Sequence, residues 1–178
     1  MTGGARRAWS HDSLGPAKGF SRAVEAASGR TIYLSGQVST DRSGEVVGVG
    51  DMTLQARTCL DKLALLLDVA GGSMKDIVEL TMYVTDMSRM AEVQAVRAGY
   101  FDGPVPPAMT GVQVVALAKP EFLIEMAATA VIEEGRGGGR GEVGGDGEQG
   151  RVGEQGGDGE QGMLGEQGGD GEEKRRPS

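Results

Sequence analysis

The sequence predicts an α+β domain in which one mixed β-sheet carries two helices on a single face, with the element order ββαβαββ. Two observations lead to this fold class. Strand-like runs alternate along the chain with two segments whose apolar residues recur at helical spacing. The last two strand-like runs are rich in valine and alanine, which is typical of a sheet that helices bury on one face.

The first two elements are predicted to form a β-hairpin. Residues 20–27 and 30–36 are strand-like, and the second run alternates at the period of two that a half-buried strand shows. Ser28 and Gly29 stand between the two runs and are a turn signal. Residues 41–50 contain many turn-forming residues, so we expect a loop there.

A first helix is predicted between Asp51 and Gly71. The Asp51 carboxylate can cap the first turn, and the glycine pair at 71 and 72 can end the last one. Apolar residues in this segment recur at helical spacing, as expected of an amphipathic helix that lies on a sheet. They are Ala56, Leu60, Leu63 and Leu67.

The remaining elements follow from the same patterns. Residues 76–85 are predicted to form a strand and residues 88–101 a second helix. Three prolines within residues 103–107 end both helix and strand pairing, because proline lacks the backbone N–H. Residues 109–117 and 122–132 are the last two predicted strands.

The C-terminal residues 134–178 differ in composition from the rest of the chain. They hold 18 of the 32 glycines, and residues 141–176 consist of three twelve-residue repeats. Such acidic, glycine-rich sequence buries too little apolar surface to offset the entropy of an ordered backbone. We therefore expect a disordered tail at 134–178, a flexible N-terminus at 1–18 and a folded domain at 19–133.

Composition argues against several functional classes. The first 133 residues carry a net charge of −3, whereas nucleic-acid binding needs clustered Lys and Arg. No apolar stretch reaches the roughly 20 residues that span a membrane. The single cysteine, Cys59, indicates a reducing compartment, the cytoplasm, and is predicted to be a small buried residue rather than a nucleophile. His11 is the only histidine, so neither a histidine-based triad nor a metal site is expected.

Three stretches carry a resemblance to a known family. Residues 30–37 read RTIYLSGQ, residues 107–117 read PAMTGVQVVAL, and residues 123–131 read LIEMAATAV. Over residues 19–133 the chain resembles the Rid/YjgF family of reactive-intermediate (enamine/imine) deaminases. The resemblance implies a chorismate-mutase-like fold and a homotrimer with small-molecule clefts between its subunits. It implies no metal and no cofactor.

The resemblance also indicates which residues line the cleft. Phe20 stands where many members carry a tyrosine, Gln94 where an asparagine often lies, and Gly111 where a cysteine is frequent. The full set of implied cleft residues is Phe20, Ser35, Gly36, Gln94, Tyr100, Phe101, Met109, Gly111 and Ala127.

Two of these positions depart from the family pattern in a way that bears on chemistry. Met109 replaces the arginine that grips the substrate carboxylate, and Ala127 replaces the glutamate thought to orient the hydrolytic water. A guanidinium offers a carboxylate two charge-assisted hydrogen bonds of about 1.5–3 kcal/mol each, whereas a thioether offers none. We therefore expect little 2-imino-acid hydrolysis of the family type, and a pocket suited to a neutral or aromatic ligand.

Glu125 is the candidate catalytic residue that remains. It lies two residues before Ala127, so strand alternation predicts that both side chains share one face of the sheet. A water-orienting role for Glu125 competes with a role in a hydrogen-bond network between subunits. Arg22 and Lys119 are further charged candidates, and both are expected to be solvated. Two functions stay open: an enamine/imine deaminase with an altered substrate, and a non-catalytic trimer that binds or senses a small molecule.

Overall fold

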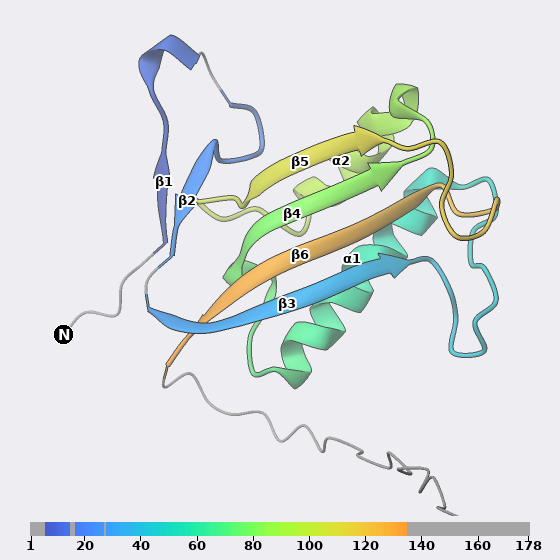
Figure 1. Cartoon of the computed structure of the whole chain (residues 1–178), viewed down its shortest axis with the longest axis horizontal. Coiled ribbons are helices and arrows are strands. Elements are labelled where there is room, and N and C mark those ends of the chain that lie inside the picture. The colour runs from blue at the N-terminus through green and yellow to red at the C-terminus, as the bar shows by residue number, and fades with distance from the viewer. Residues whose placement is uncertain (1–5, 15–16, 27, 135–178) are drawn as a thin grey trace, which may run out of the picture. The chain divides into compact units, whose positions relative to one another are not determined.

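The computed structural model describes residues 6–14, 17–26 and 28–134, whose main feature is a four-stranded mixed sheet (Figure 1). The strand order is β3-β6-β4-β5. Strand β6 is antiparallel to both of its neighbours, and β5 runs parallel to β4. The strands are β3 (Gly29–Val38), β4 (Ile77–Val84), β5 (Ala108–Gln113) and β6 (Ile124–Glu133).

Both α-helices of the described chain lie on one face of this sheet, as predicted (Figure 1). They are α1 (Met52–Val69) and α2 (Met90–Ala98). Along β6, residues buried beneath the helices alternate with partly exposed residues on the opposite face. The core of the domain therefore lies between α1, α2 and the sheet, and no helix of the described residues covers the other face, here called the open face.

Helix α1 begins and ends where its local signals predict. Asp51 is its N-cap, and the Asp51 carboxylate accepts a hydrogen bond of 2.9 Å from the backbone N–H of Leu54. Ala70 is the C-cap, and Gly71 follows with a φ of +79°, a left-handed conformation that glycine adopts without strain. The four leucine and alanine positions predicted to face the core are all fully buried.

The Asp51 cap gives a measurable prediction. Asp51→Ala is expected to lower the free energy of unfolding by about 0.5–2 kcal/mol, because the Leu54 N–H loses its acceptor. Urea denaturation measures this loss. Asp68→Ala, an exposed position in the last turn of the same helix, is the matched control. Equal stability of the two variants would show that the cap contributes nothing.

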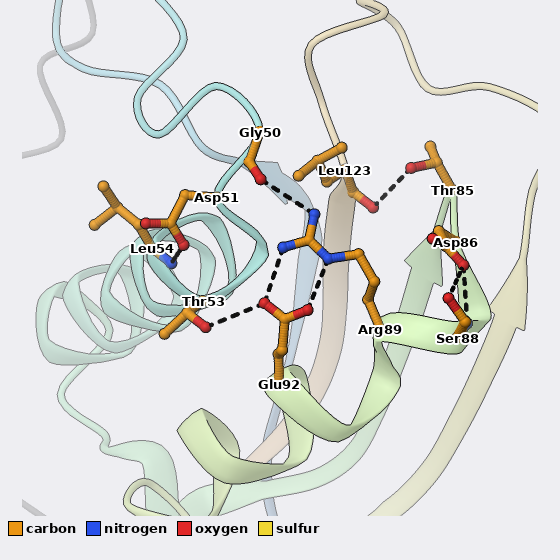
Figure 2. Close-up of polar contacts among 10 residues, drawn as sticks. All are labelled: Gly50, Asp51, Thr53, Leu54, Thr85, Asp86, Ser88, Arg89, Glu92 and Leu123. Atoms are coloured by element: carbon orange, nitrogen blue, oxygen red, sulfur yellow. Dashed lines mark hydrogen bonds and ion pairs between the residues drawn. The ribbon is translucent and has the colours of Figure 1, made fainter.

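The Arg89 side chain joins the loop before α1 to the start of α2 through an ion pair and a hydrogen bond (Figure 2). Arg89 ends the short 3₁₀ helix η3 (Met87–Arg89), and its Nε and Nη2 donate to the two carboxylate oxygens of Glu92 at 2.7 and 2.8 Å. The Nη1 of Arg89 also donates to the carbonyl of Gly50 at 3.1 Å. The guanidinium of Arg89 is therefore occupied by structural contacts.

The predicted N-terminal hairpin is wrong. Strand β2 (Ala23–Glu25) pairs with β1 (Arg7–Trp9) in a separate two-stranded sheet, and β3 pairs with β6 instead. Strand β1 is absent from the predicted order and lies within the segment expected to be flexible, as does the short 3₁₀ helix η1 (Asp12–Leu14). The turn signal is local, whereas β3 is held beside β6 because both pack under α1.

The fourth predicted strand, 109–117, is too long. Strand β5 ends at Gln113 because its partner β4 ends at Val84, and the chain then turns away with Val115 fully exposed. The predicted second helix, 88–101, becomes η3 followed by α2, which ends at Ala98. The repeat tail from residue 135 onward lies outside the described residues. No helix among the described residues is both long and apolar enough to cross a membrane.

Candidate functional site

One group of candidate residues gathers on the open face, where β3 and β6 meet. The register of these two strands shifts between Leu34 and Gln37, so that Ser35 and Gly36 together stand opposite Ala127. Because β6 alternates in burial, Glu125 and Ala127 both point to the open face. The predicted common face of these two side chains is therefore confirmed.

The Glu125 carboxylate lies directly over the backbone of Gly36. A Cβ atom at position 36 would lie 1.8 Å from Oε1 of Glu125, far inside the contact distance of two atoms. Only a glycine at this position leaves the carboxylate where it is. The bulge in β3 thus places Glu125 beside the backbone of this strand.

A shallow hollow of about 150 Å³ lies on the same open face, next to these residues. Ala127 contributes to its lining, and the Glu79 carboxylate lies on the strand beside it. Tyr33, at the rim, is 82% exposed. The complete lining is Tyr33, Leu34, Glu79, Thr81, Ala127, Ala128 and Thr129.

The second group of candidate residues lies on the other side of the sheet, at its β5 edge. Met109 and Gly111 are in register with Leu80 and Met82, which are buried beneath the helices, so they share that face. A Cβ at Gly111 would lie 3.2 Å from Cε of Met90, at the start of α2. The open face and this β5 edge, defined by Met109 and Gly111, are separated by the sheet itself.

The segment around Phe20 belongs to the β5 edge. Ser21 forms an isolated parallel bridge with Ala108, and its backbone N–H donates to the carbonyl of Pro107 at 3.0 Å. Phe20, which is half-buried, is thereby held beside the start of β5. Gln94 is exposed on α2.

Tyr100 and Phe101 follow α2 and pack against the core. The Tyr100 hydroxyl donates a hydrogen bond of 2.6 Å to Asp61 on α1. Burial, assisted by the Asp61 carboxylate, raises the pKa of Tyr100 to about 12. This hydroxyl therefore stays protonated and ties the end of α2 to α1. A role for the two aromatic rings at the lip of a cleft remains a prediction.

Sequence reasoning missed one residue of the β5 edge, Arg97. It lies in the last turn of α2, is only 8% exposed, and its Nη1 contacts Sδ of Met109. A basic residue near a helix C-terminus is ordinarily explained by the helix dipole. The signal that could have found Arg97 is its spacing, four residues after the buried Val93, which places it on the inner face of α2.

The remaining reactive residues lie outside both groups. Cys59 is buried in α1, and burial raises the pKa of its thiol to about 12, so it is unreactive, as predicted. His11 is exposed, and its Nδ1 lies 2.8 Å from the Ser13 hydroxyl. Within the described ranges, no three His, Cys, Asp or Glu side chains gather in a way that could hold a metal ion.

Comparison with known proteins places this chain and its fold in a family. The family model described as "Endoribonuclease L-PSP" matches residues 10–132. A RutC family protein of Pyrococcus horikoshii is 36% identical over 121 residues, which cover 67% of this chain and 90% of that protein. Protein DfrA of Myxococcus xanthus is 34% identical over 128 residues, which cover 71% of this chain and 96% of that protein.

Solved structures agree with the sequence relatives. The Rid-family protein YyfB from Yersinia pestis superposes with a TM-score of 0.67 at 37% identity, covering 71% of this chain and 98% of YyfB. RidA from an Antarctic Psychrobacter superposes with a TM-score of 0.54 at 30% identity, covering 66% of this chain and 91% of RidA. The matched residues include almost the whole main sheet and both α-helices. The chain is therefore a member of the Rid/YjgF family.

Proposed function

We propose that the protein is a Rid-type deaminase, a homotrimer that hydrolyses a reactive enamine or imine in clefts between its subunits. The main observation in support of this proposal is that the candidate residues lie on opposite faces of one sheet. Glu125 and Gly36 on the open face cannot contact the same small ligand as Met109 at the β5 edge within one chain. A cleft that unites them needs the open face of one copy and the β5 edge of another.

The open face supports such self-association. It is a sheet face without a helix over it, it has a hollow of about 150 Å³, and it presents the largely exposed ring of Tyr33. A sheet face of this kind is a natural subunit interface, because association removes its apolar surface from water. Three identical copies arranged around one axis bury all three open faces equally and leave none unpaired.

The chemistry that this cleft supports is addition of water to a carbon–nitrogen double bond. An enamine first tautomerises to the imine, and water then adds to the imine carbon. Glu125 accepts the proton of the attacking water and returns it to nitrogen. The carbon–nitrogen bond of the resulting carbinolamine then breaks as its hydroxyl proton passes to nitrogen, which releases ammonia and leaves a carbonyl product. The nearby backbone of Ser35 and Gly36 bounds the side of the cleft on which the water is held.

The alternative function is a trimer that binds a small molecule without hydrolysing it. Ala127 favours this alternative, because the hollow that it lines has a methyl group where a carboxylate would be needed to orient water. The description of the matched family model raises RNA cleavage as a further activity. The folded body carries more acidic than basic residues, so we do not propose RNA as its substrate. The reduced, buried Cys59 supports a cytoplasmic location.

A coupled assay tests the proposed function. An amino-acid oxidase generates 2-imino acids, semicarbazide traps them, and the protein is expected to reduce the amount of trapped product by hydrolysing the imine first. Light scattering on the same sample should give three times the chain mass of 18.4 kDa. A trimer that leaves the trapped product unchanged, beside an active family member as control, would favour the binding alternative. A monomer would refute the shared cleft.

A further inference from the structure

Arg97 is a buried cation that has no acidic partner among residues 6–14, 17–26 and 28–134. The residue is 8% exposed, and within the described part of the chain the only hydrogen-bonding partner of its guanidinium is the thioether of Met109. A thioether sulfur is a weak acceptor, and a guanidinium carries five N–H donors. Burial lowers the pKa of Arg97 from its usual value, because it disfavours the charged form of the guanidinium.

Arg89 shows what a structural arginine of this domain looks like. Its guanidinium is bound by both carboxylate oxygens of Glu92 and by a backbone carbonyl (Figure 2). Arg97 has no such partners, although it is more buried than Arg89, and a buried charge ordinarily requires pairing. The cost of burying Arg97 is therefore unexplained by the folded chain alone.

The guanidinium lies at the β5 edge, close to the segment that precedes Phe20. Its Nη2 lies 3.2 Å from the position that a Cβ of Gly19 would occupy, one residue before Phe20. Among the described residues, every fully buried side-chain nitrogen or oxygen has a hydrogen-bond partner. The nitrogens of Arg97 that lack a partner are therefore not fully buried.

We propose that Arg97 binds a carboxylate of the ligand, so that the guanidinium expected at position 109 is supplied from α2. A guanidinium presents two parallel N–H donors, which match the two oxygens of a carboxylate. The ligand is therefore a small carboxylate, rather than the neutral or aromatic molecule that Met109 by itself predicts. This inference rests on the proposed function for the position of the cleft, but it does not depend on catalysis.

The test compares an anion with its uncharged analogue on the full-length protein. Isothermal titration calorimetry measures the binding of pyruvate and of methyl pyruvate, which differ in the charge of one group. The wild-type protein is expected to bind pyruvate at least about ten-fold more tightly, the lower bound for one charge-assisted hydrogen bond. Arg97→Met should abolish this preference and leave the binding of methyl pyruvate unchanged.

Three further variants make the test specific. Arg97→Lys keeps the charge but loses the paired donors, so it should retain only part of the preference. The double variant Arg97→Met with Met109→Arg exchanges the two side chains that are in contact, so that the guanidinium stands at position 109. This variant should restore the preference for pyruvate. Arg42→Met, in the exposed loop before α1, is the matched control and should bind both probes as the wild type does. Circular dichroism checks that each variant is folded.

The outcomes separate this inference from the proposed function. An undiminished preference for pyruvate in Arg97→Met, or no preference in the wild type, overturns the role of Arg97. Imine hydrolysis without any preference for the anion rejects Arg97 and keeps the deaminase. Arg97-dependent binding of pyruvate without imine hydrolysis keeps the carboxylate site and rejects catalysis.

Discussion

Glu125→Gln is expected to slow imine hydrolysis by about 10²- to 10⁴-fold, the range that a positioned proton acceptor contributes. The amide is the same size as the carboxylate and can still donate and accept hydrogen bonds, but it cannot take a proton from water. The Glu125 carboxylate lies against Gly36 on the open face. The effect should therefore fall on kcat, and the molecular mass measured by light scattering should remain that of a trimer.

Glu79→Gln is the matched control for this prediction. Glu79 is a second carboxylate on the open face, on the neighbouring strand β4 and away from the bulge in β3. Its replacement should leave hydrolysis within a few-fold of the wild type. Loss of activity in Glu79→Gln but not in Glu125→Gln would show that Glu79, and not Glu125, is the proton acceptor. Dissociation of the trimer in Glu125→Gln would instead assign Glu125 to a network between subunits.

Leu63→Ala should have the largest effect on stability among the substitutions considered. Leu63 is fully buried between α1 and the sheet, and truncation leaves a cavity that the surrounding core fills only partly. The expected loss in the free energy of unfolding is about 2–5 kcal/mol. Urea denaturation at a fixed protein concentration measures it, because association of subunits would make the apparent stability depend on concentration.

Leu65→Ala on the same helix separates burial from residue type. Leu65 is 67% exposed, and alanine is the better helix former, so this variant should change stability by no more than about 0.5 kcal/mol. If both variants lost equal stability, Leu65 would have to be buried in solution. Its side chain, with the neighbouring exposed Leu66 and Val69, would then lie in a subunit contact.

The sequence was informative wherever the deciding interactions are local. The carboxylate of Asp51 reaches an N–H three residues away, and Gly71 takes its left-handed conformation within one turn, so both ends of α1 could be predicted. The common face of Glu125 and Ala127 follows from strand alternation alone. The bounds of β5 were missed because the end of its partner β4 determines where β5 stops pairing.

By itself, then, the sequence determined the fold class, the helix that begins after Asp51, the face of Glu125 and, through its resemblance, the family. Tertiary structure decided which strands pair, because β2 meets β1 rather than β3 through contacts that no local turn signal encodes. It also decided which charged side chain lies beside Met109. Met109 predicts an apolar site, but the packing of α2 on the sheet brings Arg97 against its sulfur. Residues on different elements combine into one chemical environment only when those elements pack, and that is why position 109 could not be interpreted alone.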